Sequence, residues 1–410
     1  MKSWTCAVAF SIVTLPVLAF DPSNMHLSSL PIPPGFMGLK AVTPDGKYLL
    51  VTMGGSPVKL ADCFLFSLES QKLDLISSNA DGTEADSESY CVGVSDDGKR
   101  VAFTSRSVKE GVQLYVRDRA AKTSTRISGC PDGSVSKMSG ITSTGVAFSR
   151  DGKHAFYTFT DWCNGNTKSP WKSFLAMATV RPDGSLDRKT LNIPGGGVLH
   201  PVFTKSGTKL SVVRYVESGI DSPKDVTIVD VATGAATIGT TDPVGIALND
   251  KMLGGAIGGN GEQIVFSSQS DKIVGSDYNG RSDVFVKQLG TGKFDLVSRT
   301  PAGNVADHNS YVSTTQMYSG LGAISDDSGR YVLFYSYASD LTEKEIRGAH
   351  CYLYDRVTKK TVLVDKNSGG VPGDAICEPI SVTSTPIKVL FRSAAKNLVS
   401  QPISQYYQAE

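Results

Sequence analysis

The amino-acid sequence predicts an all-β fold, a seven-bladed β-propeller. A short hairpin motif recurs along the chain every 52 to 68 residues. The 410 residues include 41 Gly and 19 Pro, with 40% apolar and 20% charged residues, which is typical of a turn-rich folded protein. The two ends of the chain also look like complementary parts of one repeat. Together these observations predict a ring of repeats rather than an open array.

Each copy of the motif is a short apolar strand, a tight turn and a second apolar strand, as in Val94-Ser-Asp-Asp-Gly98-Lys-Arg-Val-Ala-Phe103. In six copies glycine supplies the positive φ that such turns need. These glycines are Gly46, Gly98, Gly152, Gly207, Gly261 and Gly329. A degenerate seventh copy has Pro386 at the turn, 57 residues after Gly329.

Two more strands follow the hairpin in most repeats. Val226–Asp230 is an example of the third strand, and Phe294–Ser298 of the fourth. Four antiparallel strands in about fifty-five residues are typical of one blade of a β-propeller. The count predicts seven blades in a single propeller domain over residues 20–410, or six if one weak repeat is misread.

The chain ends indicate how the ring closes. The seventh repeat ends after its third strand, near Gln405–Gln408, while residues 24–30 resemble the fourth strand of other repeats. Because an open ring exposes a long sheet edge, we expect residues 24–30 to complete the last blade.

Residues 1–19 have the features of a secretory signal peptide. Lys2 precedes an apolar stretch from Trp4 to Leu15, and cleavage is expected near Ala19. No second long apolar run follows, so no membrane span is expected. With 41 basic and 40 acidic residues the chain lacks the charge of a nucleic-acid-binding protein. We expect a secreted or periplasmic monomer.

The turn Ser95-Asp-Asp97-Gly98-Lys99 resembles the Ser-x-Asp-Gly-Lys turn of the TolB-type, WD-repeat-like propeller repeat. The resemblance covers nearly all of the chain after residue 19, and it implies an exported propeller. TolB itself has a separate N-terminal domain for which this chain has no room. The resemblance is therefore to the repeat family and not to TolB.

Six cysteines remain after Cys6 leaves with the signal peptide, and none forms a Cys-x-x-Cys pair. An even number in an exported protein favours disulfides over metal binding. Cys63 and Cys91 take the same places in blades one and two as Cys351 and Cys377 in blades six and seven. The register therefore predicts the bridges Cys63–Cys91 and Cys351–Cys377, and leaves Cys130 with Cys163.

The binding surface is expected in the central funnel, at the end that carries the loops between blades. A His, Arg and Tyr group there could abstract a proton and stabilise an enolate. The candidates for this role are His200, Arg214, Tyr215 and His308. Candidates for ligand binding alone are Arg106, Trp162, Trp171, Tyr90 and Tyr311.

These residues support two functions. The first is a secreted propeller that binds a partner protein or a glycan at its funnel, without catalysis. The alternative is a carbohydrate-active enzyme, a polysaccharide lyase or glycosidase. The first is favoured because the sequence has no nucleophile elbow, phosphate loop, His-Glu-x-x-His motif or dinucleotide fingerprint.

Two further patterns occur in the loops, one with an expected structural role and one that resembles a metal site. Inter-blade loops repeat Gly, three residues and Asp, ending at Asp86, Asp307 and Asp374. These carboxylates are expected to accept loop amides and fix the turns. Asp277, Asn279 and Asp283 are spaced like a short calcium loop but lack the acidic density of a full one. We therefore expect no cofactor, with Ca²⁺ at these three residues as the alternative.

Overall fold

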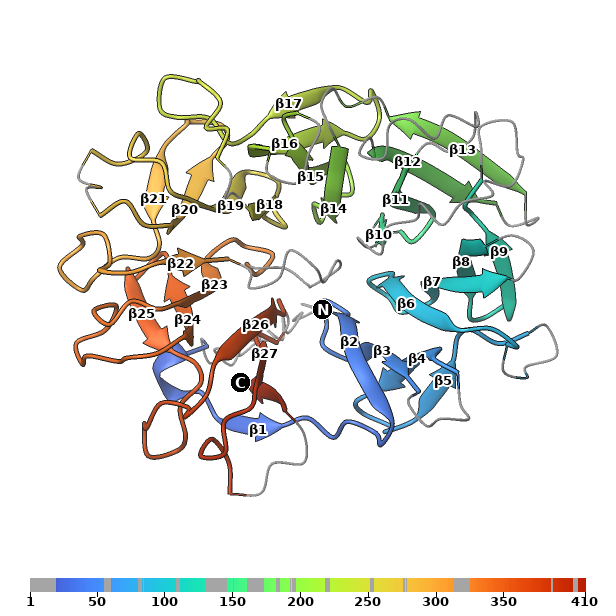
Figure 1. Ribbon diagram of the computed structural model, residues 1–410, viewed down its shortest axis with the longest axis horizontal. Coiled ribbons are helices and arrows are strands. Elements are labelled where there is room, and N and C mark those ends of the chain that lie inside the picture. Colours follow the sequence, from blue (N-terminus) through green and yellow to red (C-terminus); the bar gives the residue numbers. More distant parts are fainter. Residues whose placement is uncertain are drawn as a thin grey trace, which may run out of the picture.

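Seven four-stranded antiparallel sheets surround a common axis in the computed structural model of the chain (Figure 1). The structure describes residues 20–54, 60–79, 83, 85–107, 111–129, 146–149, 151–160, 173–181, 185–191, 193, 197–217, 222–250, 254–275, 277, 279–312, 325–384, 386–400 and 405–410. The predicted all-β propeller of seven blades is confirmed, and the six-bladed alternative is wrong.

Each blade runs from an innermost to an outermost strand. Blade 1 is β2 (Phe36–Val42), β3 (Tyr48–Met53), β4 (Asp62–Ser67) and β5 (Leu73–Leu75); blade 2 is β6 (Ser89–Val94), β7 (Arg100–Ser107), β8 (Gly111–Asp118) and β9 (Thr123–Arg126). Blade 3 is β10 (Val146–Phe148), β11 (His154–Thr160), β12 (Ser173–Val180) and β13 (Leu186–Leu191); blade 4 is β14 (Gly197–Phe203), β15 (Lys209–Tyr215), β16 (Lys224–Asp230) and β17 (Ala236–Ile238).

The remaining blades follow the same order. Blade 5 is β18 (Gly254–Ile257), β19 (Gln263–Ser268), β20 (Asp283–Gln288) and β21 (Phe294–Leu296); blade 6 is β22 (Ser310–Tyr311), β23 (Tyr331–Ser336), β24 (His350–Asp355) and β25 (Lys360–Leu363). Blade 7 is β26 (Cys377–Val382), β27 (Val389–Ser393), β28 (Tyr406–Ala409) and, from the other end of the chain, β1 (Leu27–Ser29).

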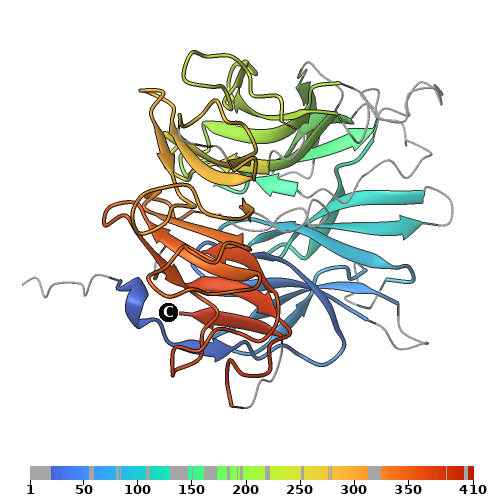
Figure 2. The same ribbon diagram turned by 60° about the vertical axis from the view of Figure 1, so that its left-hand side comes forward.

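The N-terminal strand closes the ring, as predicted. β1 pairs antiparallel with β28, with Leu27 opposite Ala409 and Ser29 opposite Tyr407. Figures 1 and 2 both show blue β1 beside the red C-terminal strands. Leu30, which follows β1, is only 3% exposed in the core between blades 7 and 1. The first described residues thus complete the last blade and cover the edge of β28.

The recurring turn is held by its own side chains. In blade 2, Ser95 Oγ donates to Asp97 Oδ1 at 2.8 Å, and Asp97 Oδ1 also accepts from the Lys99 N–H at 3.0 Å. Gly98 has φ of 67°, which a side chain would strain. Blades 1 and 3 repeat the same bonds from Asp45 and Asp151. The Ser-x-Asp-Gly-Lys signature is therefore a structural turn between the first and second strands.

The core lies between neighbouring blades. One cluster joins Val284 and Val286 of β20 to Val332 and Phe334 of β23, so blades 5 and 6 share it. Central strands are buried on both faces, and every residue of β23 and β24 is buried. This explains why these strands read as continuous apolar runs rather than alternating ones.

Two predicted disulfides are present. Cys63 is bonded to Cys91, with Cα atoms 4.9 Å apart, and Cys351 to Cys377, with Cα atoms 5.5 Å apart. Each joins a third strand to the first strand of the next blade. Cys130 and Cys163 lie outside the described residues. The two bridges fit an extracytoplasmic protein, because disulfides persist in oxidising compartments.

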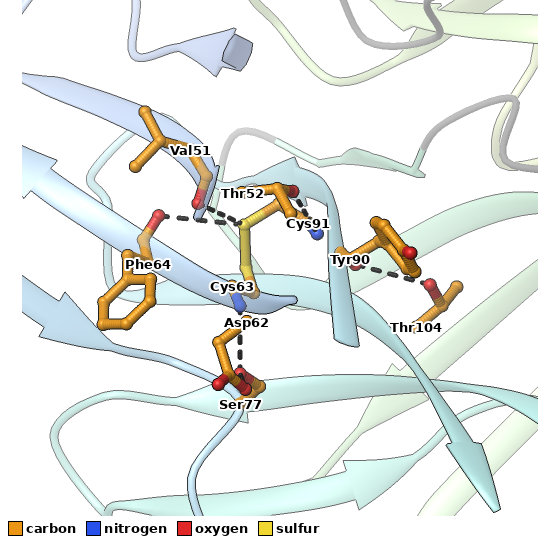
Figure 3. Close-up of a disulfide and its surroundings, with 9 residues drawn as sticks. All are labelled: Val51, Thr52, Asp62, Cys63, Phe64, Ser77, Tyr90, Cys91 and Thr104. Atoms are coloured by element: carbon orange, nitrogen blue, oxygen red, sulfur yellow. Dashed lines mark hydrogen bonds between the residues drawn. A yellow bond between two sulfur atoms is a disulfide. The ribbon is translucent and has the colours of Figure 1, made fainter. Parts of the chain in front are cut away.

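The Cys63–Cys91 bridge is surrounded by backbone hydrogen bonds (Figure 3). The Cys91 N–H donates to Thr52 Oγ1 at 3.2 Å, and the Cys63 N–H donates to Ser77 Oγ at 2.9 Å. Both cysteines are 0% exposed. The bridge therefore fastens β4 of blade 1 to β6 of blade 2 within the core.

Replacing both Cys63 and Cys91 by Ala should lower the free energy of unfolding by about 3 kcal/mol, because the unfolded chain loses a loop constraint. Urea unfolding under non-reducing conditions measures this, and the Ser70→Ala variant on the blade 1 surface is the control. Unchanged stability of the double variant would contradict the structural role of this bridge.

Candidate functional site

One end of the ring carries the loops between blades and the loops joining second to third strands. These share an end because neighbouring strands in each blade are antiparallel. We call this end the entry face. The Ser-x-Asp-Gly-Lys turns lie at the opposite end, so the repeat signature that identifies the fold is remote from the entry face.

Exposed apolar side chains gather on the entry face. Ten large apolar side chains are exposed in the described part of the chain, and eight belong to entry-face loops or to the strand ends beside them. These eight are Met37, Leu60, Tyr90, Val244, Ile246, Tyr337, Val371 and Ile376. Val357, in a turn at the opposite end, and Leu73, in outermost β5, are the other two.

Four rings of blade 6 and the loop entering it form one group, which we call the aromatic cluster: His308, Tyr311, Tyr335 and Tyr337. Tyr311 and Tyr335 stack at 5.4 Å between centroids, from opposite positions in β22 and β23. Tyr337 meets Tyr335 edge-on at 6.0 Å, and His308 lies 6.3 Å from Tyr337.

The aromatic cluster runs from the core to solvent. Tyr335 is 9% exposed, whereas Tyr337 is 43% exposed. The Tyr337 N–H donates to the Asn309 carbonyl at 3.0 Å, which fixes the loop that carries its ring. The buried rings thus hold the outer rings in place, an arrangement suited to stacking against a ligand.

Tyr311 and Tyr335 of the aromatic cluster are neutral hydrogen-bonding groups. Burial raises the pKa of Tyr311, and the neighbouring Tyr337 raises it further. Burial likewise raises the pKa of Tyr335 strongly. His308 Nδ1 accepts the N–H of Asn309 at 3.1 Å, so its Nε2 is the ring nitrogen left to contact a ligand. These groups can donate hydrogen bonds and stack, but the phenols are poor proton acceptors.

The predicted catalytic group comes from two parts of the ring. Arg214 and Tyr215 end β15 of blade 4, and His200 lies within β14 of the same blade rather than before it. The side chain of His200 is outside the described residues. His308 belongs to the loop entering blade 6, where it contacts Tyr337.

Arg214 is engaged in an ion pair. Its Nε lies 3.2 Å and 3.1 Å from the two carboxylate oxygens of Asp225, which is 0% exposed. Thr227 Oγ1 also donates to Asp225 Oδ1 at 2.7 Å. Removing either partner would leave a charge in a buried setting, so this Arg has a structural role within blade 4.

Tyr90 and Arg106 lie at the same end of blade 2, where the Arg106 N–H donates to the Glu88 carbonyl at 3.1 Å. The Tyr90 side chain is 38% exposed. Burial raises the Tyr90 pKa, the Glu88 charge adds to this rise, and Arg106 opposes it. These predicted binding residues therefore share one place on the entry face, although Trp162 and Trp171 lie outside the described residues.

Asp307 and Asp374 of the inter-blade loops accept backbone N–H groups, as expected. The N–H groups belong to the second-to-third strand loop that follows, and not to the inter-blade loop itself. Asp307 accepts the Ser339 N–H at 2.8 Å, and Asp374 accepts the Lys396 N–H at 2.7 Å. In return, Asp340 and Asn397 accept the N–H of Asp307 and Asp374. Each pair joins an inter-blade loop to the second-to-third strand loop of its blade. Asp86 accepts no such bond from the residues that the structure describes.

A hydrogen bond that was not predicted from the sequence recurs at the start of the third strand. Ser77, Ser128 and Ser298 each follow a fourth strand and accept the N–H of Cys63, Leu114 and Val284 at 2.9 Å. Each serine hydroxyl also donates to the side chain of the residue that precedes the N–H donor, which is Asp62, Gln113 or Asp283. The sequence feature that could have revealed these bonds is the Ser that follows the fourth strand, as in Ile76-Ser77. We call the two hydrogen bonds of each such Ser the strand clamp.

The predicted calcium triad is only partly assembled. Asp277 is buried, at 5% exposed, and burial raises its pKa. Asn279 instead directs its amide nitrogen to the Ala306 carbonyl, at 2.8 Å, and toward Asp283, at 3.5 Å. Its oxygen accepts the Arg281 N–H. No group of three or more His, Cys, Asp or Glu placed to hold a metal occurs among the described residues.

No protein-family model and no curated protein sequence matches this chain. Similar solved structures include TolB from Acinetobacter baumannii, 20% identical with a TM-score of 0.39 over 64% of this chain and 53% of TolB. Oligogalacturonate lyase from Vibrio parahaemolyticus is 12% identical, with a TM-score of 0.49 over 95% of this chain and 92% of the lyase.

The propeller domain of the Trilobed protease from Pyrococcus furiosus is 14% identical, with a TM-score of 0.48 over 77% of this chain and 80% of that domain. The chain spans about half of the A. baumannii TolB chain. At these identities the likeness to the three structures concerns the fold alone. The described residues contain no helix long and apolar enough to cross a membrane.

Proposed function

We propose that this chain is an exported propeller that binds a partner protein or a glycan on its entry face, with the aromatic cluster as the centre of contact. The concentration of eight exposed apolar side chains on this face carries the proposal. Exposed apolar surface rimmed by polar residues is characteristic of interaction sites. Exposed tyrosines that pack against buried side chains are also typical of the residues that contribute most of the binding energy.

The chemistry of the site supports binding more than catalysis. Arg214 is held by Asp225, and burial raises the pKa of Tyr215, so its phenol stays protonated and does not serve as a general base. Aliphatic residues such as Val244 and Ile246, 79% and 62% exposed, favour a protein partner over a sugar. Secretion follows from the predicted signal peptide and is supported by the two disulfides.

Tyr337→Ala should weaken binding at least about tenfold, as expected for a central aromatic contact. Partners are first identified by capture from the secreted fraction and by a glycan array, and affinity is then measured with the purified ligand. Because Tyr337 is 43% exposed, its replacement should leave the fold intact. Val357→Ala, at a residue 70% exposed on the opposite end, is the matched control.

The proposal fails if both variants bind the ligand like the wild type. It also fails if no ligand is found while the wild type depolymerises a polysaccharide. In that second case, His200→Ala would show whether blade 4 carries the chemistry.

A further inference from the structure

Hydrogen bonds in both directions join two loops of blade 6 on the entry face. Asp307, in the loop entering the blade, accepts the Ser339 N–H at 2.8 Å and the Ser339 hydroxyl at 2.6 Å. Asp340, in the loop between β23 and β24, accepts the Asp307 N–H at 3.1 Å. We call the bonds among these three residues the blade 6 latch. The latch places two carboxylates, those of Asp307 and Asp340, where the two loops meet.

Blade 7 has a latch of the same design with one carboxylate instead of two. Asp374 accepts the Lys396 N–H at 2.7 Å, and Asn397 accepts the Asp374 N–H at 3.0 Å. Asn397 thus takes the place of Asp340, and its amide nitrogen also donates to the Pro372 carbonyl at 2.8 Å. A carboxyl group can both accept and donate only when it is protonated, because a carboxylate has no hydrogen to donate. The protonated form of Asp340 is therefore the one that matches the blade 7 latch.

The surroundings of Asp340 disfavour its charged form. Burial raises the Asp340 pKa and the charge of Asp307 adds to the rise, while the bond from the Asp307 N–H opposes it. The other titratable groups near Asp340 are Asp283 in β20 and Tyr352 in β24, and its charge adds to the effect of burial in raising their pKa values. Neither latch carboxylate forms an ion pair with a Lys or Arg among the described residues. A negative charge on Asp340 is therefore poorly compensated.

Asp307 keeps its charge more readily than Asp340. Although partial burial opposes the shift, the hydrogen bonds from Ser339 lower the Asp307 pKa, and the charge of His308 lowers it further. As the pH falls, the first proton of the pair therefore goes to Asp340. The repulsion between the two carboxylates is present only at a pH above the raised pKa of Asp340.

The blade 6 latch holds the loops that carry the aromatic cluster. Asp307 directly precedes His308 in the loop entering the blade. Ser339 lies two residues after Tyr337, whose N–H donates to the Asn309 carbonyl at 3.0 Å. A looser latch therefore gives more freedom to both segments from which the outer rings of the cluster project.

We propose that the blade 6 latch is a pH-dependent switch, which holds the aromatic cluster in its binding arrangement in acid and loosens it at neutral pH. Because the switch regulates the same site, it rests on the proposed function. A carboxyl whose pKa is raised by folding contributes stability below its ordinary value of 3.8, and this contribution is lost as the pH rises through the raised value. Above that value the latch has two negative charges and lacks the donor that Asn397 supplies in blade 7.

The test measures amide hydrogen exchange by mass spectrometry on the full chain without a ligand, at about pH 4.5 and about pH 7.5, with each rate divided by the intrinsic rate at that pH. Protection of the segments with Asp307 and Ser339 should be at least about threefold lower at the higher pH. The segments with Asp374 and Lys396 should show no such change, so blade 7 is the internal control for global stability. Asp340→Asn should give blade 6 the pH-independent protection of blade 7.

The reverse exchange tests the same mechanism in a latch that does not carry the aromatic cluster. Asn397→Asp should make the protection of the blade 7 latch fall as the pH rises. Capture of a partner with the wild type and with Tyr337→Ala tests the proposed function separately, because the exchange experiment needs no ligand. The switch is overturned if wild-type protection in blade 6 is the same at both pH values, if Asp340→Asn keeps the wild-type change, or if Asn397→Asp leaves blade 7 independent of pH.

Discussion

Deleting residues 20–30 should destabilise the protein by at least about 5 kcal/mol. Leu30 alone is 3% exposed, and truncating a buried leucine costs about 2–5 kcal/mol. The deletion also removes the ladder between β1 and β28 and the flanking bonds from the N–H groups of His26 and Leu30. Each lost hydrogen bond adds about 1 kcal/mol.

The deleted segment also braces blade 6. The Phe20 ring packs edge-on against Tyr331 at 5.3 Å between centroids, and the Tyr331 hydroxyl donates to the Phe20 carbonyl. Without the segment, β28 becomes an exposed edge that can pair with other chains. We therefore expect a lower denaturation midpoint and concentration-dependent association.

Urea unfolding and size-exclusion chromatography measure both effects. A synthetic peptide of residues 20–31 added in trans should restore part of the lost stability. The control is Ser28→Ala, since Ser28 is the exposed residue of β1. A truncated chain with the midpoint of the intact protein would show that the ring does not depend on this strand.

The architecture was predictable because it is repeated. The hairpin turns, the ring closure and two disulfides all follow from a register that many copies define. The fourth strands of blades 3 and 4 were the exception, and the sequence placed neither β13 nor β17. β13 reads Leu-Asp-Arg-Lys-Thr-Leu and is largely exposed, so an outermost strand with one buried side leaves little apolar pattern.

The candidate site was less predictable because its residues are not repeated from blade to blade. Tyr335 and Tyr337 were not singled out, because each is one tyrosine in or beside an apolar strand and only the pairing of β22 with β23 brings Tyr335 against Tyr311. The partner of Arg214 was also hidden, since Asp225 is eleven residues away and meets it across the β15–β16 pair. Cross-strand contacts of this kind are set by register and not by local sequence.

The strand clamp of blade 6 differs from the others because it contains a charged pair, His350 and Asp365, instead of a serine. Asp365 takes the serine position and accepts the Cys351 N–H at 2.9 Å, while His350 Nδ1 lies 2.8 Å from Asp365 Oδ2. The other ring nitrogen of His350 lies 3.1 Å from the Arg347 carbonyl. Both nitrogens thus face acceptors, which favours the doubly protonated imidazolium.

Asp365→Ala should therefore lower the free energy of unfolding by about 3–5 kcal/mol, the usual effect of breaking a buried ion pair from one side. The change leaves the His350 charge and the Cys351 N–H buried, since both residues are nearly inaccessible. Ser128→Ala, the neutral clamp of blade 2, should cost only about 1–3 kcal/mol and is the matched comparison. Equal losses in urea unfolding would mean that the blade 6 pair carries no special charge interaction.

The pH dependence tests the charge state directly. Burial by itself would lower the His350 pKa, but the hydrogen bond and charge of Asp365 outweigh it and raise the pKa above 6.5. Folding therefore favours the protonated ring, and its stabilisation is complete below pH 6.5 and declines as the pH passes the raised value. The stability difference between wild type and His350→Gln should stay constant from pH 5.5 to about 6.5 and shrink at higher pH, by at most about 1.4 kcal/mol per unit. A difference that stays constant up to pH 9 would show that His350 is neutral in the folded protein.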